Sequence, residues 1–85
     1  MTYEIHFTDK ALKQLKKLDK ADQERIIKAL ERIRIRPETY LTKLVGDQGY
    51  RLRVGDYRII LDIIEQKLII LVLMVGHRKN IYKNL

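Results

Sequence analysis

The sequence predicts an α+β domain in which an antiparallel helical hairpin packs on one face of a mainly antiparallel four-stranded sheet. Apolar residues recur at helical spacing between positions 9 and 36, whereas three runs of β-forming residues occupy positions 50–75. The pair Gly55-Asp56 separates the first two runs and is typical of a two-residue hairpin turn. The expected order is therefore strand, helix, helix and three strands, with residues 1–85 forming one domain.

The first half of the chain predicts a short strand and then two helices. Apolar and polar residues alternate over positions 3–7, as in a half-buried strand, and Thr8 or Asp9 can cap the helix that follows. Pro37 ends the second helix, because proline disfavours helical backbone at the residue before it. Two apolar stripes mark the helices, namely Ala11, Leu12, Leu15 and Leu18 in the first and Ile26, Ile27, Leu30 and Ile33 in the second.

Residues 36–49 have the composition of a loop, and the remainder predicts strands. The runs 50–54, 57–64 and 68–75 are rich in β-branched and aromatic residues. The last run is apolar at every position, which is expected of a central strand covered on both faces. Beyond Gly76 the tail becomes polar, and we expect it to form one helical turn.

Composition and charge restrict the class of protein. Apolar residues make up 46% of the chain and cysteine is absent, so we expect a folded globule without disulfides. The chain begins without a basic, apolar leader, and its apolar runs are far shorter than the roughly 20 residues of a membrane span. We therefore expect a soluble, cytoplasmic protein. The net charge of +7 favours a polyanionic partner: nucleic acid, an anionic membrane surface or an acidic protein.

Three arginines are expected to share one face of the predicted hairpin. Across its two-residue turn Arg53 faces Arg58, and Arg51 lies two residues before Arg53. Side chains alternate between the faces of a strand, so all three lie opposite the apolar side chains that pack under the helices. Like charges across a strand pair are unfavourable, and Asp62 alone cannot neutralise three guanidiniums. A phosphodiester bound by forked donors accounts for the cluster, and a solvated basic face is the alternative.

A second basic motif follows the last predicted strand. The strand end brings Arg78 to the sheet edge, and Tyr82 follows four residues later, on the same side of the expected helical turn. A tyrosine beside arginines can stack on an RNA base, or it can simply anchor the tail by packing.

Together these motifs resemble those of the RelE family, within the RelE/ParE toxin superfamily. The first is YRLRVGDYRII at positions 50–60, and the second is VGHRKNIY at positions 75–82. Lys43-Leu44 with Gly46, the chain length and the order of elements also match. The resemblance covers nearly the whole chain, but the helices match only in pattern.

The resemblance implies the toxin of a type II toxin–antitoxin module, acting as a ribosome-dependent endoribonuclease without a metal or cofactor. Such toxins enter the ribosomal A site, where the ribose 2′-OH of the mRNA attacks the adjacent phosphate and leaves a 2′,3′-cyclic phosphate and a 5′-OH. The implied partners are the ribosome, mRNA and an acidic RelB-like antitoxin, with which a monomeric toxin forms a hetero-oligomer. Family positions imply catalytic roles for Arg53, Arg58, Arg78 and Tyr82, and RNA or phosphate binding by Arg51, Lys43 and Lys79.

The identity of the general base is left open. Some members of the family carry lysines at the positions of Arg51 and Arg53, whereas an arginine side chain does not give up its proton at physiological pH. The candidates are His77, Tyr82 and His6. Histidine is the commonest general base in enzymes, but strand alternation can turn His77 away from the arginines.

Two other functions remain open from the sequence. A ParE-like toxin shares the fold but acts on DNA gyrase and lacks the arginine cluster. A non-catalytic RNA-binding or regulatory module needs no general base.

The predicted helices also suggest where an antitoxin binds. They carry basic side chains around their apolar stripes, so an acidic, amphipathic segment is expected to dock on them. The basic residues are Lys13, Lys16, Lys17, Arg25, Lys28 and Arg32.

Overall fold

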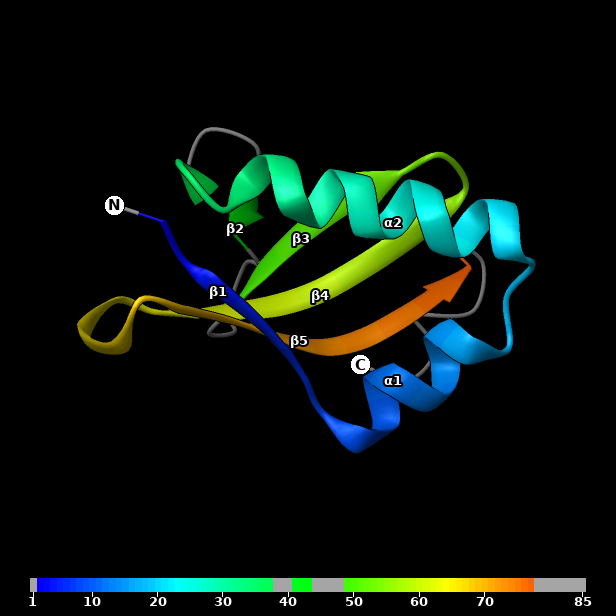
Figure 1. The fold of residues 1–85 in the computed structure, drawn as a ribbon, viewed down its shortest axis with the longest axis horizontal. Helices are drawn as coiled ribbons and strands as arrows, with labels where there is room; N and C mark the ends of the chain where they lie inside the picture. The colour runs from blue at the N-terminus through cyan, green and yellow to red at the C-terminus, as the bar shows by residue number, and fades with distance from the viewer. Residues whose placement is uncertain (1, 38–40, 44–48, 78–85) are drawn as a thin grey trace.

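A computed structural model describes residues 2–37, 41–43 and 49–77, and it has the predicted α+β fold (Figure 1). The elements in chain order are β1 (Glu4–Phe7), α1 (Asp9–Lys16), α2 (Lys20–Ile33), β2 (Thr42–Lys43), β3 (Tyr50–Val54), β4 (Tyr57–Ile64), the 3-10 turn η1 (Glu65–Lys67) and β5 (Ile69–His77). They form one sheet in the order β1-β5-β4-β3-β2, with β1 and β5 parallel and the other pairs antiparallel. The last predicted strand is thus central, as expected.

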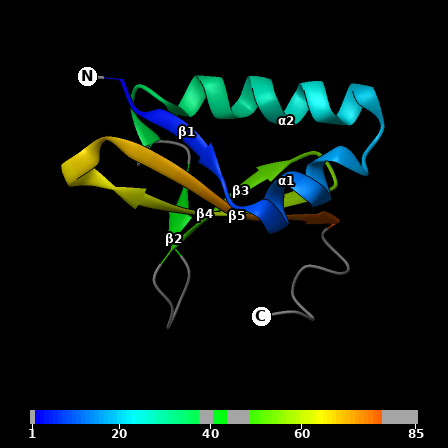
Figure 2. The ribbon, with the colours of Figure 1, turned by 60° about the horizontal axis from the view of Figure 1, so that its bottom comes forward.

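Both helices cover the same face of the sheet, which we call the helix face, and the opposite one is the far face. Figure 2 shows α1 and α2 on one side of the strands. Burying their apolar stripes against the sheet is the main driving force for this arrangement. The buried core contains Ala11, Leu15, Ile26, Leu30 and Ile33 from the helices and Leu52, Ile59, Leu61, Ile70, Val72 and Val75 from the strands.

Thr8 joins the start of α1 to β5. Its hydroxyl oxygen accepts a hydrogen bond from the N–H of Ala11 (3.1 Å) and donates one to the carbonyl of Leu73 (3.2 Å). Its own N–H donates to the carbonyl of Val72 (3.0 Å). Of the two predicted caps, the structure therefore selects Thr8.

A β-bulge lies in β5 beside this contact. Ile60 pairs with Met74, but the next residue of β4, Leu61, pairs with Val72, so Leu73 is the extra residue. The bulge reverses which side chains face the helices, and Met74 joins Ile60 in a small second cluster away from the main core.

Several element boundaries differ from the predictions, and helix α2 already ends at Ile33, before Pro37. Helix α1 ends at Lys16, and Leu18 lies in the turn, where its carbonyl accepts a hydrogen bond from Gln23 Nε2 (2.8 Å). Leu68 has a left-handed φ of 53° that closes η1, so β5 begins one residue later than predicted and continues to His77. The two-residue strand β2 falls in the predicted loop.

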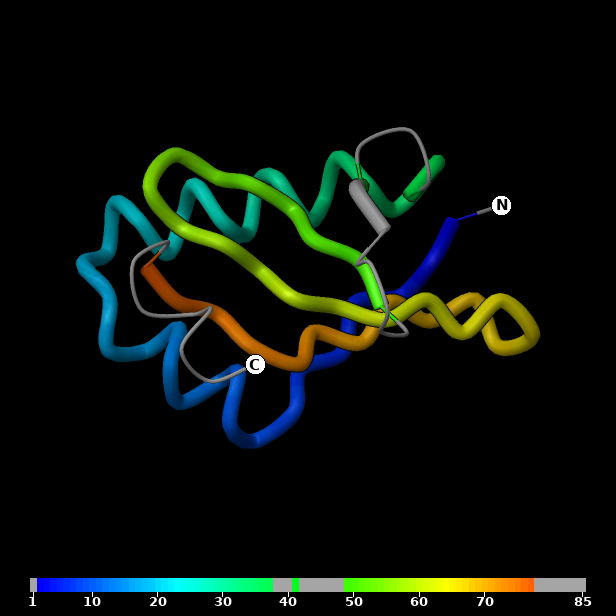
Figure 3. Tube along the Cα trace, turned by 180° about the vertical axis from the view of Figure 1, so that it is seen from behind, coloured from blue at the N-terminus to red at the C-terminus, as the bar shows by residue number. Residues whose placement is uncertain are grey.

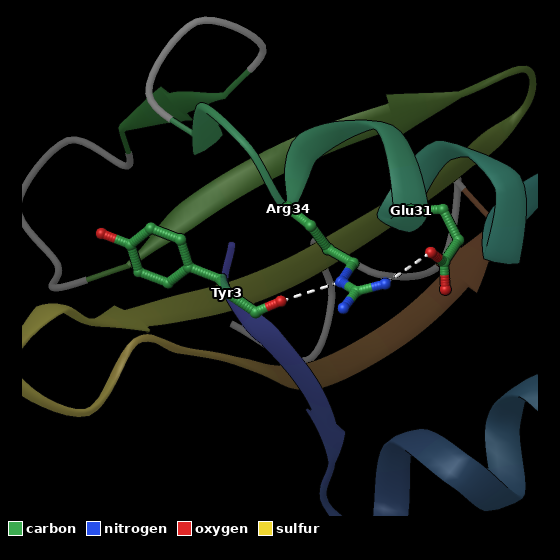
Figure 4. A network of polar contacts seen from close by, with 3 residues as sticks. All are labelled: Tyr3, Glu31 and Arg34. Carbon is green, nitrogen blue, oxygen red and sulfur yellow. Dashed lines mark hydrogen bonds and ion pairs between the residues drawn. The ribbon is translucent and has the colours of Figure 1, made fainter. Parts of the chain in front are cut away.

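Arg34 fastens the start of β1 to the end of α2 (Figure 4). Its Nε donates to the carbonyl of Tyr3 (2.8 Å), and the N–H of Tyr3 donates to the carbonyl of Arg34 (2.9 Å). Nη1 forms an ion pair with Glu31 Oε2 at 2.8 Å. This arginine therefore has a structural role.

Candidate functional site

The structure places Arg51, Arg53 and Arg58 on the far face of the sheet, as predicted. Arg53 pairs directly with Arg58 across the β3–β4 hairpin, and the whole predicted register of this hairpin is confirmed. Leu52, between the two arginines of β3, points the other way, into the core. Figure 3 views the molecule from behind, with these strands in front of α2. We call these three residues the arginine cluster.

Arg58 is the member of the cluster whose environment is least favourable to its charge. Its side-chain Nε and Nη1 are buried and have no hydrogen-bond partner within the described part of the chain. Its cross-strand neighbours are Arg53, which repels it, and Gly76, which has no side chain. A buried donor without an acceptor costs about 1–3 kcal/mol, so this guanidinium is expected to bind an anion that supplies the missing oxygens.

Asp62 does not fill this role for Arg58. It lies on the same face of β4, but four residues further along, which is roughly 13 Å at the rise of a β-strand. Its Oδ1 accepts a hydrogen bond from the neighbouring N–H of Ile63 at 2.9 Å. The nearest acid in the strand pattern is therefore engaged elsewhere.

His77 lies on the helix face, on the other side of the sheet from the arginine cluster. It pairs with Tyr57 across β4 and β5, and the two rings meet edge to face with centroids 5.8 Å apart. The structure thus does not bring this base candidate together with the arginines, in line with the alternation expected from the sequence. His6 is exposed on β1, which is separated from β4 by the whole of β5.

A polar hollow of about 160 Å³ lies on the helix face at this corner of the sheet. Within it the hydroxyl of Tyr57 donates to Asp22 Oδ2 at 3.2 Å, a contact that sequence reasoning missed. The only sequence signal is a hydroxyl at the end of an otherwise apolar strand face. The lining residues are Asp22, Arg25, Val54, Asp56, Tyr57 and His77.

The environment of Tyr57 raises its pKa. The largest cause is desolvation, followed by the hydrogen bond to Asp22 and the negative charges of Asp22, Asp19 and Asp56. Each of these disfavours the phenolate.

Tyr57 should therefore make folding more sensitive to alkaline pH. The folded protein holds this proton more tightly than the unfolded chain, so its contribution to stability is complete below about pH 10 and is lost as the pH rises through the raised pKa. We expect the free energy of unfolding, measured with a denaturant at several pH values between about 8 and 11, to fall less steeply with rising pH in Tyr57→Phe than in the parent. Tyr50→Phe, on the same face of the hairpin, is the control, and parallel losses in the parent and Tyr57→Phe would refute the assignment.

Of the remaining predicted site residues, one lies in a described strand and three lie outside the described residues. Lys43 lies in β2, where its backbone pairs with Tyr50. Arg78, Lys79 and Tyr82 lie outside the described residues, so their roles stay predictions.

The described ranges contain neither a candidate metal centre nor a candidate membrane-spanning helix. No three His, Asp or Glu side chains there are grouped so as to hold a metal ion. No helix within these ranges is both long enough and apolar enough to cross a bilayer.

Comparison with known proteins identifies the family. The model of the family described as "ParE toxin of type II toxin-antitoxin system, parDE" matches residues 5–82. Among curated proteins, the chain is 35% identical to a putative RelE-like toxin protein of Escherichia coli and 30% identical to the mRNA interferase toxin RelE of E. coli strain K12, in both cases over 93% of this chain and 86% of the relative.

Solved structures agree with this assignment. E. coli toxin RelE, as a double arginine-to-alanine mutant in the free state, superimposes with a TM-score of 0.80 at 30% identity, covering 96% of this chain and 90% of that one. The toxin of the intact E. coli RelBE toxin–antitoxin complex gives a TM-score of 0.76 at 31% identity, covering 88% and 95%. This chain belongs to the RelE/ParE superfamily, as a type II toxin of the RelE family.

Proposed function

We propose that this toxin is a ribosome-dependent, metal-independent endoribonuclease that cleaves mRNA in the ribosomal A site. The observation that carries the proposal is that Nε and Nη1 of Arg58 are buried and lack a partner in the described structure, inside a cluster of three arginines. This arrangement suits a phosphodiester, which offers oxygens at the spacing of guanidinium donors. The name of the K12 relative, mRNA interferase, supports RNA as the substrate.

In the proposed reaction the RNA supplies its own nucleophile. The 2′-OH attacks the adjacent phosphorus, the bond to the 5′ oxygen breaks, and the products are a 2′,3′-cyclic phosphate and a 5′-OH. Arg53, Arg58 and Arg78 stabilise the extra negative charge of the pentacoordinate transition state. Arg51, Lys43 and Lys79 bind flanking phosphates.

Proton transfer needs a residue other than these arginines, which stay charged at any physiological pH. Because His77 lies on the helix face, Tyr82 is the better placed candidate in the sequence, close after Arg78. Orientation of the mRNA by the ribosome supplies part of the rate, since holding the 2′-OH in line with the leaving oxygen removes much of the entropic barrier.

An acidic, RelB-like antitoxin is the proposed partner that restrains the monomeric toxin in the cytoplasm. Several solved relatives are RelB–RelE complexes, including those of Pyrococcus horikoshii and Methanococcus jannaschii. The exposed basic side chains of α1 and α2 offer this chain a surface for such a partner.

A gyrase-directed toxin is the second candidate, favoured by the ParE description of the matching family model. Binding to DNA gyrase would not explain why Nε and Nη1 of Arg58 are buried without a partner in the described structure, so we place this function second.

One pair of assays separates these functions. The purified toxin is incubated with mRNA-programmed ribosomes and with the same mRNA alone, and in parallel with gyrase in a supercoiling reaction. The proposal predicts a cut in the A-site codon on ribosomes, little cleavage of free mRNA and full supercoiling activity. Inhibited supercoiling without mRNA cleavage would establish the gyrase function, and RNA binding without cleavage would establish a non-catalytic module.

A further inference from the structure

We propose that Tyr57 is a positioning residue for Arg58: its hydrogen bond to Asp22 fixes the start of β4 from the helix face and thereby sets the guanidinium on the far face. The inference rests on the proposed function only in what Arg58 is positioned for. The order of the Arg58 side chain can be measured independently.

The contact lies where the hairpin would otherwise be least constrained. Tyr57 is the first residue of β4 and directly follows the two-residue turn, in which Gly55 has a φ of 58°. Strand ends beside a turn have few neighbours to hold them. The 3.2 Å hydrogen bond from the Tyr57 hydroxyl to Asp22 spans 35 residues of sequence and ties this strand end to the first turns of α2.

Two further contacts converge on the same corner. The ring of His77 packs edge to face against Tyr57, which joins the end of β5 to the start of β4. The guanidinium of Arg25, a residue of α2, lies close to Gly55, so α2 also reaches over the turn itself. Helix α2 and strands β4 and β5 are therefore held together by side chains on the helix face.

Within the described ranges, no comparable contact supports Arg58 on its own face. Its two cross-strand neighbours are a like charge, Arg53, and a glycine, Gly76. Two of its guanidinium nitrogens find no acceptor in the described structure. The backbone at residues 57 and 58 therefore directs this side chain. The Tyr57–Asp22 hydrogen bond restrains that backbone from the helix face.

The test removes a single oxygen atom. Tyr57→Phe keeps the ring against His77 and the core but releases Asp22, and Tyr50→Phe removes a hydroxyl from the same face of the neighbouring strand as the matched control. The side chain of Arg58 is followed through its Nε–H signal in nitrogen-edited NMR, assigned by its loss in Arg58→Lys. We expect this signal to shift and broaden in Tyr57→Phe and to stay in place in Tyr50→Phe. An unchanged Arg58 signal in Tyr57→Phe overturns the inference, whatever the protein cleaves.

Cleavage on programmed ribosomes gives the second readout. We expect Tyr57→Phe to lower kcat by roughly tenfold with KM nearly unchanged, the size of effect expected when one hydrogen bond to a charged group is lost. Because Tyr57 acts through Arg58, the same substitution should have little effect in an Arg58→Lys background. Equal losses in both backgrounds would show that Tyr57 only stabilises the fold. Absence of cleavage by the parent protein would instead refute the proposed function, and the NMR result would then decide on the positioning alone.

Discussion

Replacing Arg58 with methionine is expected to reduce cleavage by at least about 100-fold while raising the melting temperature. The activity falls because a preorganised donor to the transition-state phosphate is lost, and removal of one such donor typically costs about 10²–10³ in kcat. The stability rises because the methionine keeps the apolar stem but removes two buried nitrogens that have no partner among the described residues, together with the repulsion from Arg53.

The expected gain is about 1 kcal/mol, which corresponds to a rise in Tm of about 4–8 °C for a domain of this size. Thermal unfolding and the ribosome assay are run on the same preparations, and growth arrest on expression gives the readout in cells. Arg36→Met is the matched control, because Arg36 is exposed and lies after α2, away from the cluster. A variant that keeps its activity would refute the catalytic assignment. A lowered Tm would show that the charge of Arg58 is satisfied in the folded protein.

The on-rate of the antitoxin is expected to fall by about 10–10³-fold as salt is raised from low to high concentration, and the off-rate is expected to change less. The surface that we propose for this association lies on and around α1 and α2. There Leu12 and Ile27 are more than one-third exposed, at 37% and 39%, and a hollow of about 280 Å³ beside Ile27 offers an apolar contact. The surrounding basic residues are all exposed: Lys13, Lys16, Lys17, Arg25, Lys28 and Arg32.

Stopped-flow association of the toxin with the antitoxin encoded beside it, across a salt series, measures this effect. Neutralising Lys16 and Lys28 together should lower the on-rate at low salt and flatten the salt dependence, whereas Lys67→Gln, on the distant turn η1, should leave both unchanged. An on-rate independent of salt would contradict electrostatic steering. A toxin fully active on ribosomes with saturating antitoxin would contradict the proposed restraint.

The register of the β3–β4 hairpin was predictable because local chemistry determines it. Gly55-Asp56 specifies a two-residue turn, and that turn alone places Arg53 opposite Arg58. The apolar stripes of the helices likewise predicted that Ile26, Leu30 and Ile33 enter the core, whereas Leu12 and Ile27, which belong to the same stripes, are exposed.

The features that escaped prediction depend on contacts distant in sequence or on ambiguous pattern. Every position of the predicted last run, 68–75, is apolar, so alternation could not reveal the bulge at Leu73. The burial of Nε and Nη1 of Arg58 is a property of the folded sheet, and the Tyr57–Asp22 hydrogen bond joins residues 35 positions apart. Periodicity contains no information on either.

The chemistry of the cut tests the central claim most directly. Ribosomes are programmed with an mRNA that carries a single 2′-deoxy nucleotide on the 5′ side of the scissile bond, and with the matched all-ribose mRNA. The account predicts that the all-ribose mRNA yields a 2′,3′-cyclic phosphate and a 5′-OH, and that the deoxy mRNA is not cut at that bond. Efficient cleavage of the deoxy mRNA there, or a product with a 5′-phosphate, would contradict it.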